Sequence, residues 1–283
     1  MIFIIIGGAS ASGKTGLSKH LLDKLVQSGV SAQILNMDDY YHERPEHVSI
    51  NFFRTNTNFD TPDMLHLDLL QEHIGSLYQG MSIKKPIFNF KTNRRNGEEE
   101  IHPSDVIIME GIFAQYFYKK HWSSDMTAVT VNIGTDSYSD IIERRTKRDI
   151  SQRGRERNEC LQQERKYVGP GFLKFTASSS MGADIYINNQ HREGLDDQNL
   201  VLDAAADEII AEISKKLKEK TNTNNPSPNA QELIAKSHLM AGTLFQPNKF
   251  EGRFNGVFGT YKGDFVKVFS EKEAEELTSS LKV

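Results

Sequence analysis

The segment Gly8–Thr15 reads GASASGKT and carries the strongest chemical signal in the sequence. Its pattern, GxxxxGK[ST], is typical of a loop whose backbone N–H groups cradle the phosphates of a nucleotide. Lys14 would neutralise the β- and γ-phosphate oxygens, and the Thr15 hydroxyl would ligate Mg²⁺. The other loop residues predicted to bind the nucleotide are Gly8, Ala9, Ser10, Ala11, Ser12 and Gly13. The pattern predicts bound ATP or GTP with Mg²⁺, but not which reaction follows.

Carboxylates follow two of the apolar runs that are predicted to be strands. Glu110 ends the run 106–109, and Asp38 and Asp39 follow the run 32–36. The carboxyl ends of parallel strands open into the crevice where ligands bind, so these side chains should meet the phosphate loop. Glu110 is a candidate Mg²⁺ ligand, direct or through water, and one aspartate could accept the proton of an attacking hydroxyl. Taken alone, either aspartate could instead cap a helix or close a turn.

Arginines are concentrated in the segment RRTKRDISQRGRE, residues 144–156. Arg145 and Arg148 are three positions apart and share one helix face, while Arg153 and Arg155 flank Gly154. Forked guanidinium groups suit the binding of a transferring phosphate. The alternative is a solvated helix face, which is the usual role of a charged run.

The strand before the phosphate loop and the helix after it must hold that loop in place. Ile2–Ile6 is a continuous β-branched and aromatic run, typical of a strand buried on both faces, and apolar spacing predicts a helix over 14–28. Further strands are predicted at 32–36, 83–90 (strand or hairpin), 106–109, 127–133 and 184–187, and helices at 64–78, 140–153 and 200–219. This alternation predicts an α/β fold with a parallel, doubly wound sheet.

Composition excludes several classes of protein. The 283 residues are 37% hydrophobic and 25% charged, which is typical of a globular chain rather than a disordered one. The net charge of −4 offers no global positive field for nucleic acid or an anionic membrane. The short apolar run near the start lacks a basic flank, and the single Cys160 suits a reducing compartment, so we expect a cytoplasmic protein.

The chain divides by composition into a domain over 1–219, a polar linker over 220–231 and a small extension over 232–283. The linker reads KTNTNNPSPNAQ, in which apolar residues nearly vanish. The extension contains three short aromatic or β-branched runs separated by turn signals, which predict a β-meander, followed by a helix opened by Ser270 and Glu273. Its function is unknown, and an unidentified partner could bind it.

Residues 1 to about 215 resemble the uridine kinase (uridine/cytidine kinase) family, within the wider phosphoribulokinase and uridine kinase group. The motifs that carry the resemblance are GGASASGKT (7–15), ILNMDDYY (34–41), NFDTPD (58–63), KPIFNFKTNRR (85–95), VIIMEGIFA (106–114), RRTKRDISQRGRE (144–156) and GADIYI (182–187). The resemblance implies a P-loop NTPase-type parallel sheet flanked by helices, with a nucleoside-binding β-hairpin.

The resemblance also implies residue roles. Asp38 would be the catalytic base and would arrange Mg²⁺ together with Thr15 and Glu110. The other residues it implies in the nucleoside pocket, or around the lid and the phosphates, are Tyr41, Phe59, Asp60, Arg145, Arg148, Arg153, Arg155 and Gln163. Among these, Asp60 would hold the ribose hydroxyls, while Lys14, Arg148 and Arg153 would hold the migrating charge.

Two hairpin positions depart from the family pattern. The family usually carries Tyr and His, both reading the pyrimidine, where this sequence has Phe88 and Asn93. Phe88 could still stack but lacks the hydroxyl, and Asn93 has a shorter reach. A lost neutral hydrogen bond costs about 0.5 to 1.5 kcal/mol, enough to weaken base discrimination without abolishing transfer.

The predicted function is therefore phosphorylation of the 5′-hydroxyl of uridine or cytidine by ATP or GTP. One alternative is a P-loop kinase for another small hydroxylated acceptor, such as a sugar phosphate or another nucleoside. A second alternative is a nucleotide-binding regulatory protein without transfer activity, because the base reader is altered and a module is appended. The expected partner is a small-molecule nucleoside, and homo-oligomerisation stays open.

Overall fold

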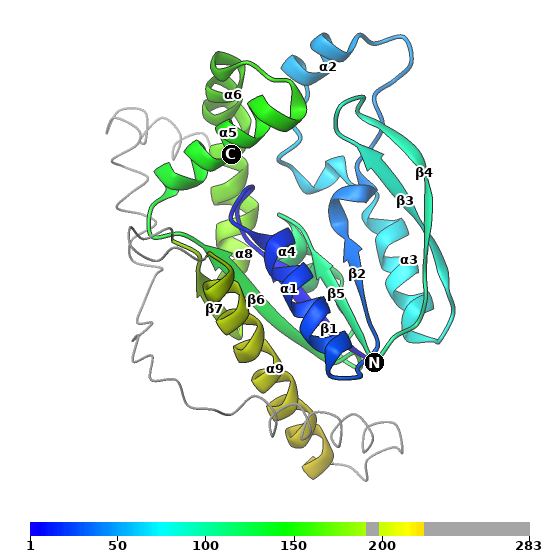
Figure 1. The fold of residues 1–283 in the computed structure, drawn as a ribbon. Coiled ribbons are helices and arrows are strands. Elements are labelled where there is room, and N and C mark those ends of the chain that lie inside the picture. The colour runs from blue at the N-terminus through cyan, green and yellow to red at the C-terminus, as the bar shows by residue number, and fades with distance from the viewer. Residues whose placement is uncertain (191–197, 224–283) are drawn as a thin grey trace.

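A parallel sheet forms the centre of the computed structural model, which describes residues 1–190 and 198–223 (Figure 1). The sheet has five strands in the order β2-β5-β1-β6-β7, and each neighbouring pair runs parallel. The strands are β1 (Ile2–Gly7), β2 (Ala32–Asn36), β5 (Val106–Glu110), β6 (Ala128–Gly134) and β7 (Ile185–Asn188). The prediction of a parallel α/β sheet is confirmed.

Helices cover both faces of this sheet. Alternate residues of a strand point to opposite faces, so Ile4 of β1 packs in one apolar core and Phe3 in the other. Residues of α1 and α9 contribute to the core that contains Ile4, and residues of α3 and α4 contribute to the other. Their bounds are α1 (Lys14–Gln27), α3 (Leu67–Tyr78), α4 (Ala114–His121) and α9 (Gln198–Thr223).

An antiparallel hairpin stands apart from the central sheet, beside α3 (Figure 1). It consists of β3 (Ile83–Asn89) and β4 (Arg94–Ile101), with a bulge between Pro86 and Phe88. The short helix α2 (Ile50–Asn56) lies near the tip of the hairpin. The hairpin option of the sequence prediction is confirmed, and its second strand extends the predicted range to residue 101.

Residues 138–180 form the helical side of the molecule. Helix α5 (Tyr138–Arg153) ends at Gly154, whose φ of +64° provides the left-handed residue that commonly closes a helix. The segments that follow are α6 (Arg157–Gln163), the π-helix η3 (Glu164–Val168), α7 (Gly169–Gly171), the π-helix η4 (Phe172–Ala177) and α8 (Ser178–Ser180). The sequence analysis predicted no elements over 157–180, and π-helical turns of this kind often accompany functional sites.

Several helix boundaries differ from prediction by one to four residues. Helix α3 begins at Leu67 rather than at residue 64, because Pro62–Met64 forms the separate 3-10 helix η2. Helix α9 continues to Thr223, past residue 220 where the polar linker was predicted to start. The rest of that linker, the predicted meander and the final helix lie outside the described residues. Within the described part of the chain, no helix is both long and apolar enough to cross a membrane.

Candidate active site

The strand order brings the predicted chemical residues to one end of the sheet. Strand β5 lies between β2 and β1, with Glu110 opposite both Asn36 and Ile6. The phosphate loop follows β1, and the 3-10 helix η1 (Met37–Tyr40) follows β2. The Thr15 hydroxyl donates a hydrogen bond to Glu110 Oε1 over 2.8 Å. Residues that are far apart in the sequence therefore share one crevice, as predicted.

The phosphate loop presents its backbone donors to an incoming anion. Gly13 caps α1 with a φ of +110° and with no side-chain hydrogen bond, so N–H groups of the first turn are open to a ligand. A Cβ on Gly13 would lie 2.3 Å from Asn189 Nδ2, so the residue must be glycine. Ser12 Oγ is buried and has no partner among the described residues. This donor set fits phosphate oxygens.

Lys14 is held inside this loop. Its ammonium group donates to the carbonyl oxygens of Gly8 and Ala9, over 3.0 and 2.8 Å. Burial lowers the pKa of Lys14, and the nearby carboxylates of Glu110 and Asp38 oppose that shift. The Lys14 ammonium can therefore exchange these carbonyl oxygens for the phosphate oxygens of a bound nucleotide.

The two carboxylates of the crevice have perturbed pKa values. Burial raises the pKa of Asp38, against the opposing charges of Lys14, Arg153 and Arg148. Burial also raises the pKa of Glu110, again against Lys14. A carboxyl with a raised pKa can exchange protons closer to neutral pH.

The oxygen atoms of this crevice suit Mg²⁺ better than a transition metal. Thr15, Asp38 and Glu110 offer hydroxyl and carboxylate oxygens, which Mg²⁺ prefers. No cluster of at least three His, Cys, Asp or Glu side chains that could hold a metal occurs among the described residues. Mg²⁺ usually completes its shell with water and substrate phosphates, so a sparse protein contribution fits this ion.

Asp39 has a different environment from Asp38, although the two are adjacent. Its carboxylate accepts from Lys85 Nζ at 2.5 Å and from the backbone N–H of Phe88 at 3.0 Å. Lys85 also pairs with Glu99 across the hairpin at 3.0 Å. Asp39 therefore fastens η1 to the hairpin, which leaves Asp38 as the aspartate that faces the phosphate loop.

The rings of Tyr41, Phe59, Phe88 and Phe90 form an aromatic cluster near Asp38. The ring of Tyr41 lies 6.2 Å from that of Phe59, 5.6 Å from that of Phe88 and 6.0 Å from that of Phe90. The Tyr41 hydroxyl donates to the Phe59 carbonyl oxygen over 3.2 Å. The structure brings together the predicted Tyr41, Phe59 and Phe88, and it adds Phe90, which the sequence analysis had not singled out.

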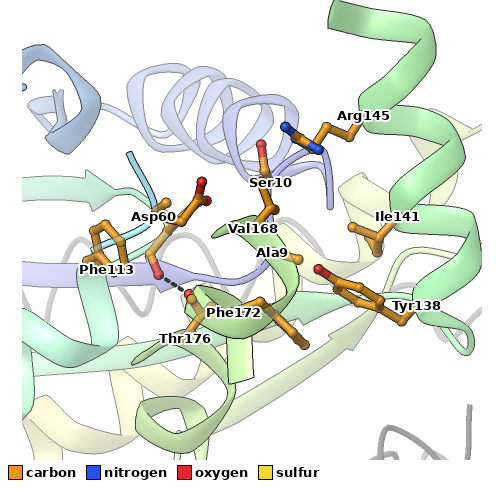
Figure 2. A pocket seen from close by; sticks show the side chains of 12 residues that line it. Ala9, Ser10, Asp60, Phe113, Tyr138, Ile141, Arg145, Val168, Phe172 and Thr176 are labelled. Atoms are coloured by element: carbon orange, nitrogen blue, oxygen red, sulfur yellow. Dashed lines mark hydrogen bonds between the residues drawn. The ribbon is translucent and has the colours of Figure 1, made fainter. Parts of the chain in front are cut away.

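A pocket joins the phosphate loop to the segment NFDTPD. Figure 2 shows Asp60 and Arg145 entering it from opposite sides, with Ser10 between them. Burial raises the pKa of Asp60 to about 6, although Arg145 opposes the shift. A Cβ on Gly171 would lie 2.3 Å from the Asp60 carbonyl oxygen, so only glycine lets η4 begin this close to Asp60. This pocket places an ionisable carboxylate near the loop.

Arg145 is fixed by a buried carboxylate rather than being free. Its Nη1 donates to Glu164 Oε2 over 2.8 Å, and the Tyr138 hydroxyl donates to Glu164 Oε1 over 2.8 Å. Glu164 lies in the π-helix η3, a segment in which no sequence motif was identified. The predicted alternative of a solvated arginine face is wrong for Arg145, which is only 5% exposed.

Asp149 organises the arginines of α5, a role that was not predicted. It is 1% exposed, and its carboxylate accepts from Arg148 Nε and Nη2 over 3.0 and 2.8 Å. Arg153 Nη1 and Arg145 Nε lie 3.4 and 3.7 Å from it. Burial acts to raise the pKa of Asp149, but these guanidinium groups outweigh that effect and the pKa is lowered.

The arginines that pair with Asp149 contact both the phosphate loop and the aromatic cluster. Arg148 Nη2 donates to Ser10 Oγ over 3.1 Å. The Arg153 guanidinium lies 4.2 Å above the ring centroid of Phe90. Cationic groups therefore contact both the phosphate loop and the aromatic cluster.

Arg155, Gln163 and Asn93 belong to one hydrogen-bonded network. Arg155 donates to Gln163 Oε1, and Gln163 Nε2 donates to the carbonyl oxygen of Arg54 over 2.7 Å. Asn93 lies in the hairpin turn, 2% exposed, and its Oδ1 accepts from Arg54 Nε over 3.2 Å. The predicted residues are thus connected through Arg54, which no sequence motif identified.

Comparison with known proteins places these features in a family. The model of the Phosphoribulokinase / Uridine kinase family matches residues 3–194. A uridine kinase from Alkaliphilus metalliredigens is 32% identical over 221 residues, which cover 78% of this chain and 98% of that kinase. A uridine kinase from Haemophilus ducreyi is 35% identical over 189 residues, which cover 66% of this chain and 84% of that kinase.

A solved structure supports the fold independently. The chain superimposes on the crystal structure of a candidate fructose transport system kinase from Silicibacter sp. TM1040 with a TM-score of 0.50. The match covers 65% of this chain and 88% of that one, at 16% sequence identity. At this identity the likeness extends to the arrangement of strands and helices only.

Proposed function

Because the chain belongs to the phosphoribulokinase and uridine kinase family, and is thus a P-loop phosphotransferase with an alcohol acceptor, we propose that it phosphorylates the 5′-hydroxyl of uridine or cytidine. The phosphoryl donor is ATP or GTP, and the product is the nucleoside monophosphate. One observation carries the proposal. Asp38, Lys14 and the Thr15–Glu110 pair lie close together, beside the aromatic cluster.

Asp38 is the proposed catalytic base. It is partly buried, its pKa is raised, and it lies near Lys14, so it can take the proton of a hydroxyl held beside the aromatic cluster. Lys14, Arg148 and Arg153 supply positive charge along the path of the transferred group. Thr15, Asp38 and Glu110 would hold Mg²⁺, which neutralises phosphate charge when bound.

The phosphoryl acceptor is proposed to lie between the aromatic cluster and Asp60. The rings of Tyr41, Phe59 and Phe88 offer flat apolar surfaces to a base. The Asp60 carboxylate can accept hydrogen bonds from two neighbouring hydroxyls of a ribose. Arg145 lines the pocket that contains Asp60, and Arg155 and Gln163, which are hydrogen-bonded to each other, are proposed to contact the acceptor from the helical side.

Binding of the acceptor should depend on the ionisation of Asp60. Because burial raises the pKa of Asp60 to about 6, its carboxyl loses the charged acceptor oxygens as the pH falls through that value. We expect the dissociation constant for uridine to fall as the pH rises from 5 to 7. By linkage, the contribution of this group to folding stability runs the opposite way, and is lost as the pH rises through about 6. Titration calorimetry at a series of pH values measures the binding.

Two variants make this pH dependence specific. Asp60→Asn should flatten the profile, because the amide does not titrate. Asp63→Asn changes an exposed carboxylate of the same segment and should keep the wild-type profile. An unchanged step near pH 6 in Asp60→Asn would exclude Asp60 as its source.

A panel of acceptors tests the proposed function. Purified protein is incubated with Mg²⁺ and either ATP or GTP, together with uridine, cytidine, other nucleosides, sugars and sugar phosphates, and the products are separated by chromatography. We expect uridine 5′-monophosphate and cytidine 5′-monophosphate. Transfer to a sugar phosphate alone would replace the proposed acceptor, and absence of any product would favour a regulatory role.

A further inference from the structure

Arg54, in the last turn of α2, binds the tip of the hairpin. Its Nη2 donates to the carbonyl oxygens of Phe90 and Lys91 over 3.1 and 3.0 Å, and its Nε donates to Asn93 Oδ1 over 3.2 Å. One guanidinium group thus holds three acceptors of a single turn. The fixed fork of arginine suits such multiple contacts, which a lysine cannot reproduce.

The backbone of Arg54 binds the helical side of the molecule, opposite the hairpin. Its carbonyl oxygen accepts from Gln163 Nε2 over 2.7 Å, and Gln163 in turn accepts from Arg155. Gln163 is 7% exposed, so this contact is shielded from water. Arg54 therefore ties the hairpin to the helical side, and α2 occupies the place between them in Figure 1.

The hairpin turn needs such support because its backbone is unusual. Asn93 has a φ of +53°, a left-handed conformation that Asn tolerates better than most residues. Asn89 Oδ1 satisfies the N–H groups of Lys91 and Thr92 over 2.8 and 3.3 Å. The carbonyl oxygens of Phe90 and Lys91 point the other way, to Arg54. The side chains on either side of the turn, Phe88 and Asn93, depend on this arrangement.

The contact with Arg54 also sets the orientation of the Asn93 amide. A guanidinium group only donates hydrogen bonds, so the oxygen of the amide must face Arg54. Within the described residues, Nδ2 of Asn93 is left without a partner. The polar group that the hairpin tip can offer to an acceptor molecule is therefore a donor.

We propose that Arg54 is a positioning residue for the acceptor: it ties the hairpin tip to the helical side at Gln163 and orients Asn93 so that the tip presents an N–H donor. This inference rests on the proposed function, because it assumes that the acceptor lies between the hairpin and Gln163. It gives Arg54 no role in binding the phosphoryl donor, since Arg54 contacts neither the phosphate loop nor Asp149 through any hydrogen bond described above.

Arg44 provides a matched comparison. Its backbone N–H donates to the Asn93 carbonyl oxygen over 2.8 Å, and its Nε donates to the Thr92 carbonyl oxygen over 3.3 Å. Arg44 thus supports the same turn by a hydrogen bond from its side chain, but it has no contact with Gln163. Arg44→Ala removes a comparable charge from the hairpin while leaving the link between the hairpin and the helical side, and the Asn93 amide, in place.

Steady-state kinetics test the proposal. We expect Arg54→Ala to raise the KM for uridine about 10- to 100-fold, the range expected for losing charged hydrogen-bond donors. The KM for ATP should change less than about twofold, because the phosphate loop is untouched. Arg54→Lys should recover part of the loss, and Arg44→Ala should raise the KM for uridine less than Arg54→Ala does. Equal increases in both KM values, or no increase for uridine, would overturn the proposal.

Hydrogen–deuterium exchange separates this proposal from the proposed function. In Arg54→Ala, backbone amides of 89–95 should exchange faster because the side-chain hydrogen bonds to the hairpin are lost. Those of 157–165 should also exchange faster, because the substitution frees α2, which carries the carbonyl oxygen that Gln163 binds, from the hairpin. Arg44→Ala should accelerate only 89–95. Hydrogen–deuterium exchange needs no turnover, so it tests the positioning role of Arg54 even if the wild-type protein phosphorylates neither uridine nor cytidine. Unchanged exchange at 157–165 in Arg54→Ala would show that the hairpin and the helical side are not coupled through this residue.

Discussion

Asp38→Asn should lower kcat by about 100- to 10,000-fold, the usual contribution of a positioned general base. The amide cannot accept the proton of the attacking hydroxyl at neutral pH. Asn is nearly isosteric with Asp, and the backbone hydrogen bond from Asp38 N–H to Asn36 Oδ1 does not depend on the side chain. The affinity for ATP, measured by calorimetry with a non-hydrolysable analogue, should stay within a few-fold of the wild-type value.

Asp39→Asn gives the contrast for this prediction, because it changes the neighbouring carboxylate. Asp39 pairs with Lys85 and accepts from Phe88 N–H, so its replacement should loosen the hairpin and raise the KM for the acceptor. We expect kcat to fall far less than in Asp38→Asn. Near-normal turnover of Asp38→Asn would rule out Asp38 as the base, and an equal loss of kcat in both variants would rule out the distinction between them.

The second large effect is expected for Asp149→Asn, which removes the shared counter-charge of the arginine cluster. Arg148 and Arg153 would then lose their buried counter-charge, and Arg145 would keep only its ion pair with Glu164. Removing one partner of a buried ion pair costs about 3 to 5 kcal/mol of unfolding free energy. We expect a loss in this range by chemical denaturation, together with a reduced kcat, because Arg148 and Arg153 lose the group that orients them.

The pH dependence of this loss has a defined sign. Because the pKa of Asp149 is lowered in the folded protein, its stabilising contribution is present above the ordinary value of 3.8 and disappears as the pH falls below it. The stability difference between wild type and Asp149→Asn should therefore shrink in acid. A difference that is the same at pH 7 and in acid would contradict a charge-based role.

Glu143→Gln is the control on the same helix. Glu143 pairs with Lys147 at 2.7 Å, and the two side chains are 64% and 75% exposed. Exposed pairs of this kind contribute little because solvent screens them. Its stability and kcat should match wild type, and a loss as large as that of Asp149→Asn would point to general disturbance of α5.

The phosphate loop and the central strands could be predicted because their signals are local. Continuous apolar runs such as Ile2–Ile6 are typical of strands buried on both faces, and the loop motif needs only its own residues and their flanks. Asp38 and Glu110 could be predicted as site residues because each lies at the end of a predicted strand. The structure places both in one crevice because β5 lies between β2 and β1.

Residues whose roles depend on tertiary contacts were not predicted. In the sequence, Asp149 looks like an ordinary helix-face carboxylate, and Glu164 lies in a segment for which no element was predicted. Only the packing of α5 against the π-helical segment buries them. Arg54 carries no motif, because its partners are carbonyl oxygens that any residue could provide. Short or irregular helices such as α4 and α6 have too few turns for a clear apolar period.

The anchoring of the phosphate loop by Asn189 has a consequence for the order in which the chain becomes functional during synthesis. Asn189 Nδ2 donates to the Ser12 carbonyl oxygen over 2.8 Å, and its backbone N–H donates to Gly134 at the end of β6. A ribosome releases the loop early but Asn189 only after most of the domain has emerged. The nascent chain thus gains its complete nucleotide cradle with the last strand of the sheet. Any nucleotide bound there favours the docking of β7, since a ligand that prefers the finished fold stabilises it by mass action.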